Sequence, residues 1–255
     1  MTTLLPDLST GRHTLLTVAS APGRPRVRTR ITGDPSSPCL RPMLLASGPS
    51  RARVALVPDG ALLLAGDTVR LDVVVGSGTR LDLVEPAGTV AFDMRGGAAT
   101  WDVRVELAEG ATLVWAGEPF VVAAGARVIR TTEVKVSRGA RLALRETLVL
   151  GRHRERGGHL EQSWSAYGPD GRPVLVEHLV LDETAHRPGI LGGNRAMGSV
   201  IALGFQSAEG FQSAEGDRGC GRLDLERGGT LWRGLGQDAH RAVPAQAWQR
   251  VLDAC

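Results

Sequence analysis

A short phrase returns along this chain: a turn that ends in glycine, one or two small or polar residues, and then alternating apolar residues. Its clear copies place the glycine at Gly60, Gly78, Gly110 and Gly139, and a weaker copy places it at Gly171. From Gly78 onward these glycines are 32, 29 and 32 residues apart. Glycine accepts a positive φ without steric cost, so each copy suits a tight reversal between two strands. This regular spacing of turn signals predicts a repeating β unit.

The segments between the turns alternate in hydropathy with a period of two. In 69–75 the apolar residues alternate with Arg70, Asp72 and Val74, and in 101–107 they alternate with charged residues. In 142–150 leucine recurs at every second position on both sides of a polar interruption. This period predicts strands with one apolar face, and shorter strands are expected near 15–18 and 27–31. The predicted fold class is mainly β, with two-layered, repeat-like stacked β-sheets, few helices and a short C-terminal helix.

The 255 residues fit one β domain over 1–255. Within it, 1–40 is expected to be a variable N-terminal segment. Residues 187–221 are rich in glycine and contain a perfect tandem duplication at 205–216, which predicts a loop region. Residues 244–254 are predicted to form the closing helix, because Pro244 pre-sets the first helical φ and the apolar residues after it share one face.

Composition and charge exclude several classes of function. The net charge of +3 is modest and aromatic residues make up 4%, which disfavours a nucleic-acid interface. A run of 18 apolar residues and a secretory leader are both absent from the sequence, so we expect a cytoplasmic protein that does not bind membranes. The widely spaced Cys39, Cys220 and Cys255 are expected to be reduced thiols in that compartment.

The sequence contains none of the common catalytic motifs. The phosphate-binding loop of nucleotide hydrolases, the dinucleotide-binding glycine motif and the serine nucleophile elbow are all missing, so we predict that the protein is not an enzyme. The histidines do not show the spacing of a strong metal site. His153, Glu155 and His159 remain weak candidates for a transit site, because nickel accepts imidazole and carboxylate ligands.

Five segments, in this order and at this spacing, resemble the urease accessory protein UreD family, called UreH in some systems. They are a Gly-Asp hairpin with its strand at 62–75, then 83–89, 118–126 and 145–152, and a closing segment at 231–236 followed by the helix that carries Trp248. Lys135 is the one lysine among thirty basic residues. The chain therefore looks like a divergent, arginine-rich branch of that family.

The resemblance implies a scaffold rather than a catalyst. Members of the family bind apo-urease and form a complex with the accessory proteins UreF and UreG, of which UreG is the GTPase. Through this complex nickel reaches the urease active site. The resemblance therefore implies nickel in transit and no tightly bound cofactor, and it leaves open a homodimer within the complex.

A passage for a hydrated divalent cation needs carboxylates and water more than a closed cage of ligands. Candidates for lining such a passage, or for contacting a partner, are Asp67, Glu85, Glu118, Glu146 and Arg152. The alternative role of each is turn formation or an ion pair on a strand face. Gly66, Gly78, Gly110, Gly139 and Gly151 are expected to serve the backbone of turns.

Two other functions stay open from the residues alone. One is a β-repeat carbohydrate-binding or lyase-type protein, which stacked strands with polar faces would suit. The other is a hydrolase, which predicts a pocket that gathers His153, His159 or His178 with a carboxylate and a hydroxyl group.

Overall fold

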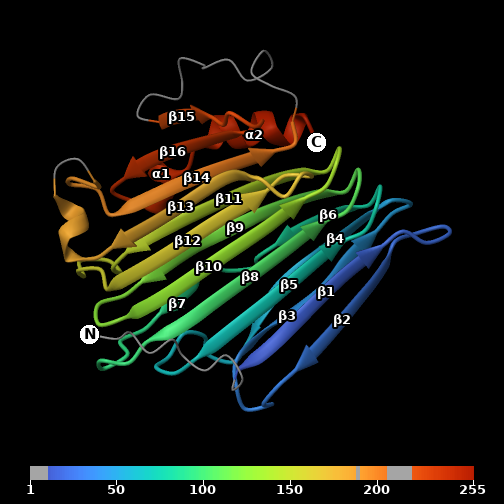
Figure 1. The fold of residues 1–255 in the computed structure, drawn as a ribbon. Helices are drawn as coiled ribbons and strands as arrows, with labels where there is room; N and C mark the ends of the chain where they lie inside the picture. Colours follow the sequence, from blue (N-terminus) through green and yellow to red (C-terminus); the bar gives the residue numbers. More distant parts are fainter. Residues whose placement is uncertain (1–10, 188–189, 206–219) are drawn as a thin grey trace.

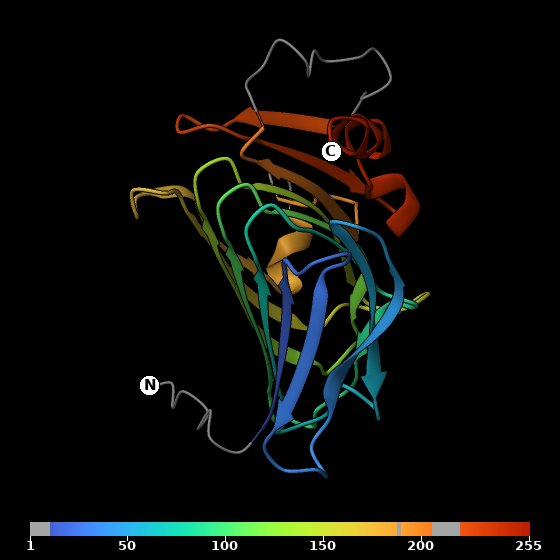
Figure 2. The same ribbon diagram turned by 90° about the vertical axis from the view of Figure 1, so that its right-hand side faces the viewer.

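The computed structural model describes residues 11–187, 190–205 and 220–255. In these residues two β-sheets face each other as layers, and a helix covers the outside of one of them (Figure 1 and Figure 2). The predicted mainly β, two-layered and repeat-like fold with a short C-terminal helix is therefore confirmed.

The first layer, sheet A, has seven described strands. In chain order they are β1 (Arg12–Ala19), β2 (Arg26–Thr32), β5 (Thr68–Val75), β8 (Ala99–Leu107), β10 (Arg127–Val136), β12 (His159–Tyr167) and β13 (Pro173–Leu181). In space they follow the order β13-β12-β10-β8-β5-β1-β2. The strands predicted near 15–18, 27–31, 69–75 and 101–107 all lie in this sheet.

The second layer, sheet B, has nine described strands. They are β3 (Cys39–Ser47), β4 (Arg51–Asp59), β6 (Arg80–Val84), β7 (Thr89–Ala91), β9 (Thr112–Val122), β11 (Arg141–Leu150), β14 (Ala196–Leu203), β15 (Cys220–Asp224) and β16 (Thr230–Gly236). Their order is β15-β16-β14-β11-β9-β6-β4-β3, with β7 beside β9. The helical elements are the 3₁₀ turn η1 (Glu183–His186), α1 (Ala239–Ala242) and α2 (Ala245–Asp253).

From β4 to β12 the chain winds as a solenoid, since each strand in one sheet is followed by a strand in the other, with the short β7 added to sheet B. Successive strands of the same sheet pair in parallel, as β5 does with β8 and β9 with β11. One coil therefore stacks on the next, and the period of about thirty residues in the sequence is the length of one coil.

The repeated glycine turns connect the two sheets. The turns at Gly78, Gly110 and Gly139 each lead from a strand of sheet A to a strand of sheet B, so the hairpin geometry expected for them is wrong. They stack in a column, where the Gly78 N–H donates to the Glu109 carbonyl at 3.0 Å and the Gly110 N–H donates to the Arg138 carbonyl at 3.1 Å. Only the weaker copy at Gly171 joins antiparallel neighbours, β12 and β13. A glycine at positive φ suits either connection, so the motif did not distinguish them.

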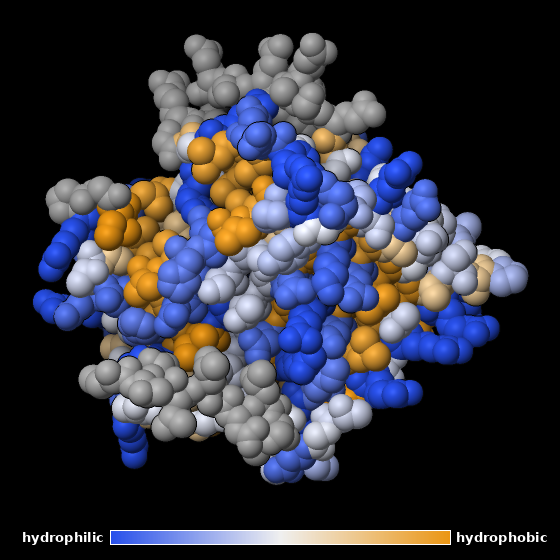
Figure 3. All heavy atoms as spheres, viewed as in Figure 1, coloured by the Kyte–Doolittle hydropathy of each residue, from blue (hydrophilic) through white to orange (hydrophobic). Residues whose placement is uncertain are grey.

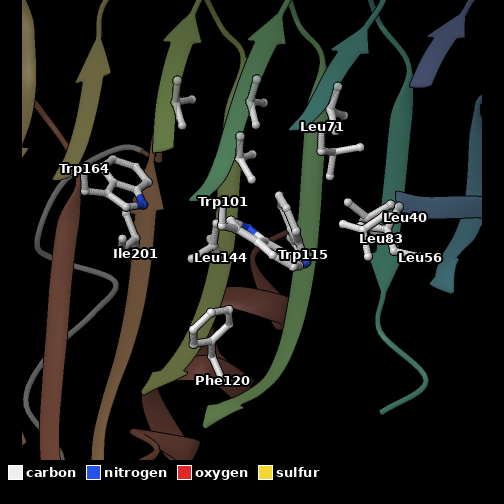
Figure 4. Close-up of a cluster of buried hydrophobic side chains, with 14 of the residues drawn as sticks. Leu40, Leu56, Leu71, Leu83, Trp101, Trp115, Phe120, Leu144, Trp164 and Ile201 are labelled. Carbon is white, nitrogen blue, oxygen red and sulfur yellow. The ribbon is translucent and has the colours of Figure 1, made fainter. Parts of the chain in front are cut away.

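The core lies between the two sheets. Alternate residues of β5 and β8 are buried there, and the large side chains of Trp101, Trp115, Phe120, Leu144 and Trp164 gather in the middle (Figure 4). The indole of Trp101 meets the ring of Phe120 edge-on, with centroids 5.6 Å apart. Burial of these rings is the main stabilising contribution to this part of the core.

The prediction of a loop region over 187–221 is wrong in part, because this segment contains β14. Every residue of β14 is buried, since one face of the strand meets the core and the other meets the helical elements. The duplicated hexapeptide lies outside the described residues except for Phe205. Residues 245–253 form α2 as predicted, and Ala247, Trp248 and Val251 pack on sheet B.

The outer face of sheet A is polar. Figure 3 shows a band of hydrophilic side chains across this face, with hydrophobic groups to its sides. On the outer faces of the strands of sheet A, the ammonium of Lys135 lies 3.6 Å from the carboxylate of Glu133, and Nε2 of His13 lies 2.8 Å from the carboxylate of Asp72. In the part of the chain that the structure describes, none of the helices has the length and apolar character needed to span a membrane.

Candidate functional site

Sheet B is interrupted at one level of the solenoid. The register between β9 and β11 shifts there, because Gly117 and Glu118 of β9 stand opposite the single residue Glu146 of β11. On the other side of β9, β6 ends at Val84 and β7 begins at Thr89, so 85–88 leaves the ladder at the same level. Bulges of this kind redirect side chains and are common beside functional sites. We call this place the sheet-B break and define it by Glu85, Glu118, Arg130, Arg145 and Glu146.

Gly117 allows the strands to approach each other at the break. A Cβ atom at this position would lie 2.5 Å from the carbonyl oxygen of Arg145, which is closer than real contacts allow. A larger residue would therefore push β9 away from β11. The sequence forms the break here because glycine occupies the point of closest approach.

Glu85 turns inward from the gap between β6 and β7. Its carboxylate accepts the indole N–H of Trp115 at 2.9 Å and the backbone N–H of Glu118 at 3.0 Å. Burial raises the pKa of Glu85, and the two hydrogen bonds and the charge of Arg130 oppose that rise. The carboxyl group therefore holds two neighbouring coils together while it lines the interior.

Glu146 is the most enclosed of the carboxylates at the break, with 9% of its side chain exposed. It forms an ion pair with Arg130 of β10 and accepts the amide N–H of Gln162 of β12 at 2.9 Å. Arg130 also donates to the Gln162 side-chain oxygen at 2.9 Å. A charge so nearly buried is tolerated because this network satisfies it.

Arg145 and Glu118 lie on the side of the break that faces the C-terminal helix. The Arg145 guanidinium donates to the Gly117 carbonyl at 3.2 Å and to the Glu118 carboxylate at 3.2 Å. It also lies over the ring of Trp248 in α2, 5.7 Å from the ring centre. The side chain of Glu118 is 40% exposed, so the break reaches the protein surface at this point.

A small cavity of about 30 Å³ connects these groups inside the protein. Its lining includes the three carboxylates of Glu85, Glu118 and Glu146 and the aromatic rings shown in Figure 4. The indole N–H groups of Trp101 and Trp164 are buried without a protein acceptor. Buried donors of this kind need a polar partner, so the cavity suits water or another small polar occupant.

Three of the five candidate passage residues thus meet at one place. Glu85, Glu118 and Glu146 come from successive coils, and their spacing of about thirty residues in the sequence is the spacing of the coils. Arg130, Arg145 and Gln162 were missed. The same spacing would have placed Arg130 and Gln162 on neighbouring strands of sheet A, where they are paired in register.

The other two candidates lie elsewhere. Asp67 accepts the backbone N–H of Leu64 at 2.7 Å and so forms a turn before β5. Arg152 forms a two-fold ion pair with Glu155 at 2.9 Å, and this pair lowers the pKa of Glu155 to about 2. A role for either residue in partner contact stays a prediction.

The expected turn glycines have the backbone that was predicted for them. All five have positive φ, namely Gly66, Gly78, Gly110, Gly139 and Gly151. The weak transit site at His153, Glu155 and His159 is not assembled. Over residues 11–187, 190–205 and 220–255, no three His, Cys, Asp or Glu side chains form a group that could hold a metal ion.

His178 does meet a hydroxyl and a carboxylate. Its Nδ1 lies 3.1 Å from the Ser163 hydroxyl oxygen, and its Nε2 lies 3.9 Å from the Glu161 carboxylate. All three belong to the outer faces of β12 and β13, and more than half of the His178 side chain is exposed. The hydrolase alternative requires a pocket, but at this histidine the structure has an open strand face. Such a face neither excludes water nor positions a substrate.

The sheet-B break gathers charged and polar groups around one cavity. Carboxylates from three coils line it together with two guanidinium groups and buried indole N–H donors that have no protein acceptor. Such an arrangement can solvate an ion briefly without holding it tightly.

Comparisons with known proteins agree with the resemblance in the sequence. Residues 13–254 match the family described as UreD urease accessory protein. A protein named urease accessory protein UreD 1 from Streptomyces griseus is 53% identical over 165 residues, which cover 64% of this chain and 64% of that relative. The alignment thus spans less than two thirds of that relative's length.

Two further relatives align over a larger share. Urease accessory protein UreD from Frankia alni is 37% identical over 205 residues, or 73% of this chain and 69% of the relative. The Streptomyces coelicolor protein of the same name is 32% identical over 203 residues, or 74% and 80%. These matches favour the family over the carbohydrate-binding and hydrolase alternatives, and the chain belongs to the UreD family of urease accessory proteins.

Proposed function

We propose that this protein is a non-catalytic maturation factor for urease, which binds apo-urease together with the accessory proteins UreF and UreG and lets nickel pass into the urease active site. It acts in the cytoplasm and holds nickel only in transit. Any nucleotide hydrolysis is supplied by UreG.

The observation that carries the proposal is the sheet-B break. Carboxylates are otherwise rare between the two sheets, where the lining is apolar and aromatic. At the break Glu85, Glu118 and Glu146 line one cavity, and Glu118 brings it to the surface. Carboxylate oxygens can replace water molecules around a passing nickel ion without enclosing it.

Family membership supports the partners in this proposal. The relatives are named urease accessory proteins, and a scaffold for a partner enzyme needs a rigid frame with a polar surface. Stacked coils with mixed-charge outer faces meet that need.

The proposal is tested in cells that carry the matching urease operon with this gene deleted. Complementation compares the natural gene with Glu118→Gln, with Glu85→Gln and with a matched control, Glu133→Gln, whose carboxylate lies on the outer face of sheet A. We expect the deletion to leave urease synthesised but poor in nickel, and the control to restore it. The two variants at the break should leave urease bound to the scaffold but lower its nickel content.

Each part of the proposal can fail separately. Urease with normal nickel content in the deletion strain would remove the maturation role. Normal nickel content with both break variants would remove the passage but leave the scaffold role in place.

A further inference from the structure

The guanidinium of Arg130 places a positive charge inside the sheet-B break. Arg130 projects from β10 toward sheet B, between the inward-facing Val128 and Thr132, and its side chain is 13% exposed. It lines the same cavity as Glu85 and Glu146. An arginine at an inward position of a solenoid strand is unusual, because the neighbouring coils normally place apolar groups there.

The hydrogen bonds of Arg130 to other side chains are made by one atom of its guanidinium group. Its Nη1 atom makes the ion pair with Glu146 and the 2.9 Å hydrogen bond to Gln162. Its Nε atom is buried and has no protein acceptor. The guanidinium also lies 4.9 Å from the centre of the Phe120 ring, which is a cation–π contact. The side chain is therefore incompletely satisfied where it stands.

Arg145, the other guanidinium at the break, is held differently. It donates to the Gly117 carbonyl from two of its nitrogens and to the Glu118 carboxylate from one. The Trp248 ring of α2 packs against it. Because Arg145 is held by β9 and by α2 together, it is part of the frame of the break.

We propose that Arg130 is the gate of this passage: its guanidinium occupies the place beside Glu146 that a divalent cation in transit would take, and the cation passes only when Arg130 leaves that carboxylate. The identity of the cation as nickel rests on the proposed function. While Arg130 stays, its positive charge repels a second cation in a partly dry interior, where charges interact more strongly than in water. Once it moves, Glu146 and the oxygen of Gln162 become ligands for the passing ion.

The test measures how nickel changes the melting temperature of the purified full-length protein. Arg130→Gln removes the gate and leaves Glu146 in place, and Arg130→Gln with Glu146→Gln removes both. Arg233→Gln is the control, because it breaks another partly buried arginine–glutamate pair, which is more exposed and lies away from the cavity. A cation that replaces the guanidinium stabilises only the folded state, so it raises the melting temperature.

We expect nickel to raise the melting temperature of Arg130→Gln by about 3 °C or more at a tenfold excess over its Kd. The natural protein, the double variant and Arg233→Gln should not shift, and magnesium should have less effect than nickel. A destabilised Arg130→Gln protein still gives a result, because nickel should then restore part of the lost stability. No difference in the nickel response of Arg130→Gln and the natural protein would overturn the gate.

The test of the gate and the test of the proposed function can fail separately. Arg130→Gln can respond to nickel in isolation while the deletion strain makes nickel-replete urease, in which case the gate stands and the maturation role fails. The reverse pair of results would keep the maturation role and remove the gate.

Discussion

Replacing both members of the Arg130–Glu146 ion pair by apolar residues should lower the free energy of unfolding far less than replacing either one alone. Glu146→Leu leaves the Arg130 guanidinium nearly buried without its counter-charge, and Arg130→Met does the same to the carboxylate. Loss of one partner of a buried pair typically costs about 3–5 kcal/mol. Because both side chains keep some exposure, we expect each single variant to lose about 3 kcal/mol.

The double variant Arg130→Met, Glu146→Leu removes both charges and adds apolar surface among Phe120, Leu144 and Trp164. Apolar replacements of buried pairs are often neutral or stabilising, although the Gln162 amide loses two partners and this loss costs about 1 kcal/mol or more. We therefore expect the double variant to lie within about 1–2 kcal/mol of the natural protein, with a coupling energy above about 2 kcal/mol.

The assay is urea unfolding followed by fluorescence of the core tryptophans, with midpoints compared at constant slope. With a slope of about 2–3 kcal/mol per molar for a large domain, each single variant should unfold at roughly 1 M lower urea. Additive costs in the double variant would refute the claim that these two side chains act as one buried unit. The double variant should also fold yet fail to deliver nickel to urease, because it lacks the Glu146 carboxylate.

Three further outcomes follow from the geometry. Gly117→Ala places a Cβ 2.5 Å from the Arg145 carbonyl oxygen, so it should lower unfolding stability by about 1–3 kcal/mol in urea titrations; an unchanged midpoint would contradict the close approach. Trp248→Ala empties the contact between α2 and sheet B and should cost about 3–5 kcal/mol in calorimetry, whereas a loss below about 1 kcal/mol would show that α2 is not anchored by this ring. Arg152 lowers the pKa of Glu155 from 4.5 to about 2. The natural protein should therefore have a higher free energy of unfolding than Glu155→Gln above pH 4.5, and this difference should disappear as the pH falls toward 2. Denaturation at each pH measures it, and a difference that does not change with pH would refute the reasoning.

The repeat and the strands at 69–75 and 101–107 could be predicted because each of these strands has one buried face and one face that is less buried and mostly polar. Val69–Val75 and Trp101–Leu107 alternate with a period of two, and both are strands with that burial pattern. The connection type could not be predicted, because a Gly-ended turn fits a hairpin and a crossover equally well. Only the parallel register shows that the chain changes sheets.

β14 was missed for a different reason. Its sequence, Ala196–Leu203, has no alternation because both of its faces are buried, and its glycine and the neighbouring glycines suggested a loop. The break was anticipated only as separate carboxylates. Arg130 escaped notice because the residues around it, Val128–Thr132, do not show which face of β10 points inward until the neighbouring coils are in place.

The column of stacked turns at Gly78, Gly110 and Gly139 also bears on how the molecule unfolds. Each coil contacts mainly the coil before it and the coil after it, so cooperativity is passed between neighbours rather than shared by the whole molecule at once. Amide hydrogen exchange should therefore be slowest in the central coils, which have neighbours on both sides, and faster in the terminal strands β2 and β13. The sheet-B break lies among those central coils, where local opening is rarest, and its carboxylates are thus held in the least dynamic part of the solenoid.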